Sequence, residues 1–269
     1  MADIGSKAVE IMAKVRAAKP LIHHITNFVV MNETANITLC AGALPVMAHA
    51  RQEAEEMAGT ADALVLNLGT LWPEQVEAML MAGRCANQRG IPVVLDPVGA
   101  GATSFRSESA LRLLTEMSIS VARGNLAEIA TLAGYRADMK GVESIASEAA
   151  AADVAVAFAT KYGCVAAITG AVDVVTDGKQ IRRVSNGDPL MRFVTGTGCM
   201  STAVIGAYVA VERDYVAASA AALAAFGLAG EIAAKGTPGP GTFHVRLYDA
   251  LAGLTPEVFA AGMRMEVTR

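Results

Sequence analysis

The sequence predicts an α/β fold, in which a doubly wound, mostly parallel sheet is covered by helices on both faces. Short apolar runs typical of buried strands alternate with helical patterns at spacings of about 25–30 residues, as in right-handed βαβ crossovers. The 269 residues suffice for one large domain, and no internal repeat or low-complexity linker divides them. We therefore expect a single domain over residues 1–269.

The composition indicates a chain with a large core and subunit interfaces. Hydrophobic residues make up 53% of the chain and charged residues only 18%, which is apolar for a soluble monomer. A net charge of −4 gives no support to nucleic-acid or membrane partners. The apolar segment 217–234 is rich in alanine and contains Glu231, so a buried helix is favoured over a membrane span.

The first residues contain no basic stretch and no long apolar run, so no signal peptide is visible and we expect a cytoplasmic protein. The four cysteines lie far apart and form no Cys-x-x-Cys pair, which argues against a zinc site or a redox pair.

A first helix is predicted after the cap residue Ser6, because Val9, Met12 and Val15 recur at helical spacing until Pro20 ends the pattern. The following elements are assigned from apolar periodicity, glycine and proline. We expect strands at 20–27, 43–47, 63–69 and 91–96, and helices at 27–41, 51–57 and 73–90.

The second half of the chain repeats this scheme. A strand, polar residues and the start of a helix fall within 119–128, and the turn at Asp177 and Gly178 predicts a hairpin over 172–184. We expect a strand at 164–170 and helices at 142–162, 203–211, 216–235, 242–251 and 256–265.

Residues 194–202 form the most informative stretch. Gly196 and Gly198 flank Thr197, and such a sequence before an apolar helix brings several backbone N–H groups close to one point, as in a phosphate site. Cys199 falls at the same helix N-terminus, where the pKa of a thiol is lowered. The stretch therefore predicts phosphate binding beside a cysteine able to take part in chemistry.

Further polar residues follow predicted strands, and in an open α/β sheet the ends of parallel strands converge on one edge. Asp96 ends one strand, and either binds a ligand or caps the next turn. Arg123 carries a planar donor suited to phosphate oxygens. Glu128 lies three residues after Asn125, so the pair forms either part of a site or a capping box.

Asp96 and Glu128 together with phosphate oxygens predict a magnesium site, because this ion prefers few protein carboxylates plus phosphates and water. Asn27, Met47 and Thr169 also lie at strand ends. Met47 either packs on a polarisable ligand such as a sulfur heterocycle or belongs to the core. These parts suit phosphoryl transfer.

Other chemistries fit less well. The chain contains no Gly-x-x-x-x-Gly-Lys-Ser/Thr motif, and its glycine-rich stretch falls too late for a dinucleotide fold. A cysteine hydrolase requires a histidine beside Cys199, and nothing in the sequence favours one. The neighbours His23 and His24 point to opposite faces of a strand, so they do not form a metal pair.

Six segments, at 25–27, 45–47, 95–100, 123–128, 168–170 and 194–199, occur in an order and spacing that resemble hydroxyethylthiazole kinases, the thiamine-salvage branch of the ribokinase-like kinases. The resemblance covers nearly the whole chain. Cys199 is its most diagnostic point, because most ribokinase-like kinases have aspartate there. Asp188 is a local departure, where relatives often carry histidine.

The resemblance implies magnesium-dependent transfer of phosphate from ATP to the hydroxyethyl group of 4-methyl-5-(2-hydroxyethyl)thiazole, in a homotrimer with active sites between subunits. Met47 and Gly196 would contact the thiazole, with Asn27 nearby and Gly196 leaving room for the alcohol. By the same resemblance, ATP would be bound by Arg123 and Thr169, and magnesium held directly or through water by Asp96 and Glu128.

The resemblance further implies that Cys199 lies where the alcohol is attacked, with the backbone of Thr197 and Gly198 beside it. Two alternatives stay open. One is a related kinase for another small alcohol such as a hydroxymethylpyrimidine, in which aspartate is expected at 199. The other is a nucleotide-binding sensor without catalytic activity.

Overall fold

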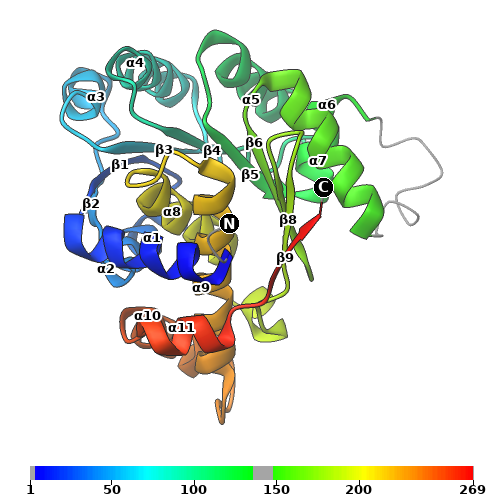
Figure 1. Cartoon of the computed structure of the whole chain (residues 1–269). Helices are drawn as coiled ribbons and strands as arrows, with labels where there is room; N and C mark the ends of the chain where they lie inside the picture. Colours follow the sequence, from blue (N-terminus) through cyan, green and yellow to red (C-terminus); the bar gives the residue numbers. More distant parts are fainter. Residues whose placement is uncertain (1–3, 136–147, 269) are drawn as a thin grey trace.

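The computed structural model describes residues 4–135 and 148–268, which build one nine-stranded sheet flanked by helices (Figure 1). The strand order is β2-β1-β3-β4-β5-β6-β7-β8-β9, parallel as far as β6 and antiparallel from there to β9. The strands are β1 Leu21–Ile25, β2 Leu44–Val46, β3 Ala63–Asn67, β4 Val93–Asp96, β5 Val121–Asn125, β6 Val165–Thr169, β7 Asp173–Thr176, β8 Ile181–Val184 and β9 Met265–Thr268.

Helices cover both faces of this sheet, as the doubly wound prediction requires. Figure 1 shows α3 and α4 on one side of the sheet and α1, α2 and α8 on the other. The helices are α1 Ile4–Ala18, α2 Met31–Ala41, α3 Arg51–Ala58, α4 Pro73–Arg89, α5 Ser104–Glu116, α6 Leu126–Ala133, α7 Glu148–Tyr162, α8 Thr197–Val209, α9 Tyr215–Ala234, α10 Pro240–Ala252 and α11 Pro256–Gly262, with a short 3-10 helix η1 at Pro189–Phe193.

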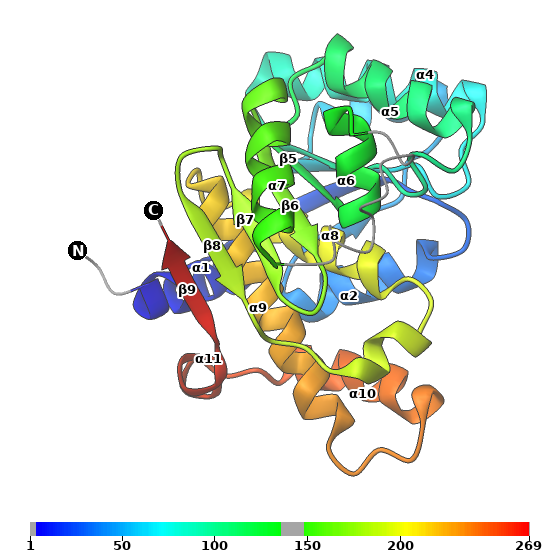
Figure 2. The same cartoon turned by 90° about the vertical axis from the view of Figure 1, so that its right-hand side faces the viewer.

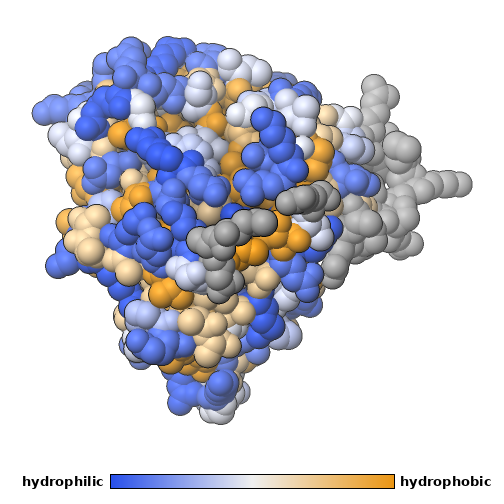
Figure 3. Space-filling view, viewed as in Figure 1, coloured by the Kyte–Doolittle hydropathy of each residue, from blue (hydrophilic) through white to orange (hydrophobic). Residues whose placement is uncertain are grey.

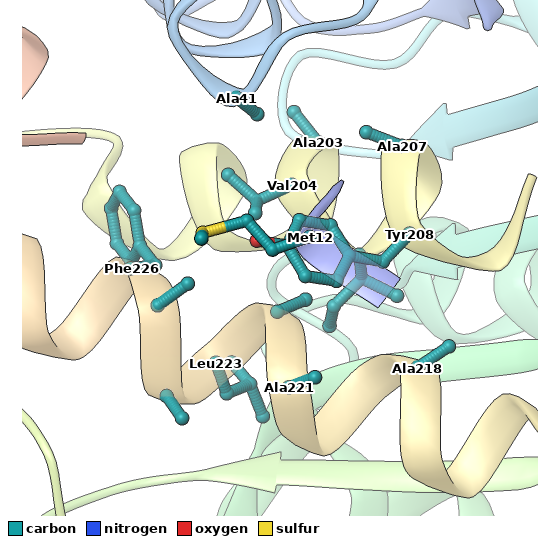
Figure 4. Packing of buried hydrophobic residues seen from close by; sticks show 14 of the residues in the cluster. Met12, Ala41, Ala203, Val204, Ala207, Tyr208, Ala218, Ala221, Leu223 and Phe226 are labelled. Carbon is teal, nitrogen blue, oxygen red and sulfur yellow. The ribbon is translucent and has the colours of Figure 1, made fainter. Parts of the chain in front are cut away.

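The larger of the two cores surrounds α8 and α9. Figure 4 shows Met12 and Tyr208 in the space between the two helices, with Ala221 of α9 below them. Ala203 and Ala207 lie on the other side of α8, toward Ala41 of α2. Small side chains let the helices approach closely while the large ones exclude voids. Alanine-rich helices are therefore buried on nearly all sides here.

Among the described residues, α9 is the one helix whose length and composition would allow it to cross a membrane. In this fold 89% of its apolar window is buried inside the molecule, which is the arrangement of a core helix. The prediction of a buried helix at this place is confirmed.

Several predicted boundaries differ from the structure. Helix α1 begins at Ile4, so Ser6 lies inside the helix and does not cap it. The helix predicted at 256–265 ends at Gly262, and Met265 instead begins β9, which pairs with β8. A four-residue edge strand buries too little apolar surface for its periodicity to be visible in the sequence. Residues 142–147 of another predicted helix lie outside the described residues.

The parallel strands all end at the same edge of the sheet. Helix α8 contacts β1, β3 and β4 of this sheet, and Figure 2 shows it beside α2, which packs on it as well. The N-terminus of this buried helix therefore lies where the strands that carry Asn67, Asp96 and Arg123 end.

Candidate active site

A cluster of polar side chains surrounds Asp96 at the end of β4, and we call Asn27, Asn67, Asp96, Cys199 and Thr202 the polar cluster. The Asp96 side chain is 1% exposed. The Thr202 hydroxyl donates to Asp96 Oδ2 at 2.7 Å, and Asn67 Nδ2 donates to the same oxygen at 3.1 Å. The carboxylate is thus held by side chains from α8 and β3, and it is not the cap of the turn that follows β4.

Burial raises the pKa of Asp96 to about 6, although the charge of Arg123 and the hydrogen bond from Thr202 act in the opposite direction. Its second oxygen, Oδ1, is buried and has no hydrogen-bond partner within 4–135 and 148–268. An unsatisfied buried carboxylate oxygen is costly, so this atom is suited to a ligand that supplies positive charge or a donor.

Asn27 and Cys199 complete the polar cluster. Asn27 follows β1, donates from Nδ2 to Asn67 Oδ1 at 2.6 Å and approaches the Cys199 sulfur at 3.8 Å. Burial, followed by the charge of Asp96, raises the pKa of the Cys199 thiol to about 12. The expectation of a lowered pKa at the helix N-terminus is wrong, because desolvation and a nearby carboxylate outweigh the helix dipole.

Arg123 connects the polar cluster to a neighbouring cavity. Its side chain is 12% exposed, and Nη1 lies 3.6 Å from Asp96 Oδ2. Nη2 donates to the hydroxyl of Thr169 at the end of β6. The family resemblance implies that both residues bind ATP, and in the structure their side chains are in direct contact.

Residues 196–199 form the N-cap and first turn of α8, so this helix begins at Thr197 and not at the predicted position 203. Gly196 is the N-cap with φ of 89°, and the Met200 N–H donates to the Gly196 carbonyl at 2.8 Å. The N–H groups of Gly198 and Cys199 have no acceptor among the residues that the structure describes, as is usual in the first turn of a helix. The positive end of α8 therefore presents free donors beside Arg123.

Both glycines of this turn are required by close neighbours. A Cβ at Gly198 would lie 2.7 Å from Arg123 Nη1, and one at Gly196 would lie 2.4 Å from Val30 Cγ1. The space next to Gly196 is thus filled by a core side chain. The expectation that Gly196 leaves room for an alcohol stays a prediction, because the Val30 contact concerns only the Cβ direction of this glycine.

Glu128 and Asn125 form a capping box at the start of α6, which is one of the two alternatives predicted from the sequence. Its Oε2 accepts from the Asn125 N–H at 2.8 Å, while the Asn125 side chain accepts from the Glu128 N–H at 2.9 Å. Its Oε1 accepts from the Gly99 N–H at 2.8 Å and so fixes the turn after Asp96. Each carboxylate oxygen of Glu128 already accepts one hydrogen bond from a backbone N–H. Only the remaining lone pairs of these oxygens are available to bind a metal ion or its waters.

A cavity of about 710 Å³ opens next to Arg123. Among the predicted site residues, its lining includes Arg123, Thr169, Thr197 and Gly198. The Thr197 hydroxyl donates to a backbone carbonyl of η1 at 2.9 Å and so ties the helix to the far wall. The volume suits a ligand of nucleotide size.

The walls of the cavity differ in character. Apolar side chains of Met191, Leu223 and Phe226 line one part, and Arg192 and Asp188 line another. Asp188 caps η1 by accepting from the Leu190 N–H at 2.9 Å. Asp188, which the resemblance marks as a departure, thus stabilises the start of η1.

Asp173, the first residue of β7, also lines the cavity and was not singled out by the sequence. It accepts from the Gly170 N–H at 3.0 Å, which closes the turn after Thr169. Burial raises its pKa to about 7, with the Gly170 hydrogen bond and the Arg123 charge acting against that rise.

The structure does not bring Met47 into the polar cluster or the cavity lining. Met47 follows β2, the edge strand of the sheet, and is partly exposed. His23 and His24 are both fully buried, and they bond to the Ala48 carbonyl and to the Thr38 hydroxyl respectively. They are core histidines on opposite faces of β1.

Sequence reasoning missed Asn67 and Thr202, although signals for both existed. Asn67 ends a buried strand next to Asp96 in the sheet register, in the same way that Asp96 ends its own strand. Thr202 lies three residues after Cys199 and therefore on the same face of α8. Its position inside an apolar run concealed its role.

Comparisons with known proteins point to one family. Residues 12–257 match the family model described as the hydroxyethylthiazole kinase family. A hydroxyethylthiazole kinase of Desulforudis audaxviator is 52% identical over 269 residues, covering 100% of this chain and 98% of its own. One from Chloroflexus aurantiacus is 54% identical over 262 residues, covering 97% of each chain.

Solved structures give the same result for the fold. The hydroxyethylthiazole kinase protein of Pyrococcus horikoshii superposes with a TM-score of 0.90 at 43% identity, covering 97% of this chain and 99% of that one. A pyridoxal kinase of Staphylococcus aureus solved with pyridoxal reaches a TM-score of 0.63 at 17% identity, covering 93% of this chain and 98% of that one, which shows a shared fold. With a family match over most of its length and relatives more than half identical to it, this chain belongs to the hydroxyethylthiazole kinase family.

Proposed function

We propose that this protein phosphorylates the hydroxyethyl group of 4-methyl-5-(2-hydroxyethyl)thiazole with ATP, giving the thiazole phosphate for thiamine salvage. Family membership supports the reaction class. The observation that best supports the assignment of the active site is that three groups lie close together. They are the Arg123 guanidinium, the free N–H groups of α8, and the Asp96 carboxylate with its unsatisfied Oδ1.

Phosphoryl transfer requires positioning and charge stabilisation more than covalent chemistry. The first turn of α8, which carries the N–H groups of Gly198 and Cys199, lies directly against the Arg123 guanidinium, because a Cβ at Gly198 would lie 2.7 Å from Arg123 Nη1. Donors fixed in a folded helix need no rearrangement as charge develops on the transferred group. We assign these groups to the phosphates of ATP, with Thr169 holding Arg123 in place.

Cys199 assists by position in this proposal. With a pKa of about 12 its thiol keeps the proton at neutral pH, so it does not act as a thiolate base. A largely dissociative transition state needs little base assistance, which is consistent with a neutral thiol at this place. Asn27 and Cys199 then border the space for the acceptor alcohol.

The donor set fits magnesium, which takes few protein carboxylates and keeps several waters. Within the described part of the chain, no group of three or more histidine, cysteine or acidic side chains is placed to hold a metal ion by itself. Asp96 would hold the ion through Oδ1, and Glu128 would hold its waters with the lone pairs left free by the capping box. The ion would neutralise charge on the phosphates.

Met47 and Gly196 are proposed to contact the thiazole in a homotrimer whose sites lie between subunits. Large exposed apolar side chains in β2 and in the segment after its neighbour β1 support an interface on this part of the molecule: Phe28 at 63%, Val29 at 58% and Leu44 at 45% exposure. On the face drawn in Figure 3, hydrophobic residues interrupt the hydrophilic surface in several places. A second chain would cover such residues.

A coupled assay of ADP release, run with and without the thiazole alcohol, tests the function. We expect turnover that requires both the alcohol and MgCl₂ and that falls at least a hundredfold with a hydroxymethylpyrimidine as acceptor. Equal ADP release with and without the alcohol would overturn the proposal, and a preference for the pyrimidine would reassign the substrate.

Light scattering on a sizing column tests the assembly separately. Three copies of the 27.7 kDa chain give a particle of about 83 kDa. A monomer at micromolar concentration would overturn the assignment of sites between subunits while leaving the kinase reaction standing.

A further inference from the structure

Asn67 and Thr202 hold the Asp96 carboxylate by one oxygen only. Thr202 Oγ1 donates to Oδ2 at 2.7 Å, and Asn67 Nδ2 donates to Oδ2 at 3.1 Å. All three residues are at most 2% exposed, so water does not compete for these bonds. Charge-assisted hydrogen bonds of this kind are stronger than neutral ones.

The two oxygens of Asp96 are therefore different. Oδ2 receives two donors and also lies 3.6 Å from Arg123 Nη1, whereas Oδ1 has no partner among the residues described. A carboxylate free to rotate would exchange its oxygens. The two donors fix its rotation and leave one oxygen with its lone pairs available.

The orientation of the Asn67 amide is itself fixed. Its Oδ1 accepts from Asn27 Nδ2 at 2.6 Å and from the Gly69 N–H at 2.9 Å. Two donors on the oxygen side oblige the NH₂ group to face Asp96. Asn67 thus links Asn27, beside Cys199, to the carboxylate of Asp96.

We propose that Asn67 and Thr202 are positioning residues that orient Asp96, so that Oδ1 and not Oδ2 is presented to the phosphate and its metal. This rests on the proposed function of Asp96. Neither residue needs to touch a substrate. Each acts through the carboxylate, which is why its loss should change catalysis and magnesium dependence more than affinity for the alcohol.

Thr202→Val tests this with little change of volume, and Thr202→Ser restores the hydroxyl. For Thr202→Val we expect kcat to fall at least tenfold while KM for the thiazole alcohol stays within threefold. Thr202→Ser should return kcat to within threefold of wild type. Thr38→Val is the matched control: it removes the hydroxyl of another buried helical threonine, bonded to His24 and a backbone carbonyl, and should leave kcat unchanged.

A second readout does not require turnover. The MgCl₂ concentration for half-maximal thermal stabilisation by ADP should rise at least fivefold in Thr202→Val and in Asn67→Leu, and recover in Thr202→Ser. In an Asp96→Asn background, Thr202→Val should add less than a twofold change. An equal effect in both backgrounds would mean that Thr202 acts on the fold and not through Asp96, which overturns the proposal.

The two proposals fail separately. If the wild type shows no thiazole-dependent turnover but the magnesium shift and its rescue by serine appear, the kinase assignment falls and the positioning role stands. If the wild type is an active thiazole kinase and Thr202→Val matches it in kcat and in magnesium dependence, the positioning role is overturned.

Discussion

The polar cluster and the adjoining cavity are built in opposite ways. In the cluster, buried side chains from α8, from the ends of β3 and β4 and from the segment after β1 bond to one another. The cavity encloses about 710 Å³ and is lined by a mixture of apolar, charged and backbone groups. Arg123 takes part in both, through Asp96 on one side and Thr169 on the other.

This difference assigns a physical task to each region. A cluster of mutually bonded groups holds its donors and acceptors in place before the substrate arrives, which is what charge stabilisation in a transition state requires. An open cavity exchanges a large ligand with solvent. Mutations in the cluster should therefore lower kcat, whereas mutations in the cavity should mainly raise KM for ATP.

The largest effect should come from removing the centre of the polar cluster. We expect Asp96→Ala to lower kcat by about a thousandfold, because it deletes a buried charge that positions phosphate and metal. Steady-state kinetics across a magnesium titration measures it, with the exposed Asp153→Ala as control. A titration curve that overlays the wild type would show that the magnesium site is wrongly assigned.

A smaller effect is expected where the two regions meet. Gly198→Ala places a methyl group 2.7 Å from Arg123 Nη1, so the guanidinium must leave its position between Asp96 and Thr169. KM for ATP should rise about tenfold. Gly241→Ala, with no atom within 4 Å of its new methyl group, should leave KM unchanged. An unchanged KM in Gly198→Ala would separate Arg123 from nucleotide binding.

Cys199→Ser should cost less than about fivefold in kcat, because a neutral thiol contributes position and not a proton acceptor. The pKa of about 12 lies above the assay range, so the thiol stays protonated from pH 7 to pH 9. Wild type and Cys199→Ser should show the same pH profile over that range. Complete loss in both Cys199→Ser and Cys199→Asp would overturn the assisting role.

The smallest expected effect is on the pH dependence of stability, through Asp173 in the cavity wall. The folded-state pKa of Asp173 is raised from 3.8 to about 7, so the folded protein keeps a proton that the unfolded chain loses. Stability supplied by this group is present below pH 4 and is lost as the pH rises towards 7.

Asp173→Asn keeps an acceptor for the Gly170 N–H and removes the charge. Its thermal midpoint should therefore match the wild type near pH 4 and exceed it by a few degrees at pH 8. A constant difference between pH 4 and pH 8 would show that the carboxyl group titrates normally.

Much of the site was predictable because the ends of parallel strands converge on one edge of an open α/β sheet. Asp96, Arg123 and Thr169 end or lie within neighbouring parallel strands, and the structure brings them together through the register of the sheet. The capping reading of Glu128 is confirmed as well, because a capping box depends on residues only three apart. Local rules succeeded where the interacting groups are close in sequence or fixed by strand order.

Predictions failed where the answer depended on packing. The Cys199 pKa is raised and not lowered, because the neighbours that decide it come from distant strands and from burial. Thr202 was overlooked because an apolar run does not reveal that one hydroxyl faces Asp96, 106 positions away.

The sequence by itself determined the alternation of strands and helices, the glycine-rich stretch before a buried helix and the edge of the sheet where polar residues gather, since these depend on periodicity and on glycine placement. Only the tertiary structure decided which oxygen of Asp96 is held, which group occupies the space beside Gly196, and the protonation of Cys199. Those outcomes depend on distances between groups far apart in the chain and on the water that folding removes from around them.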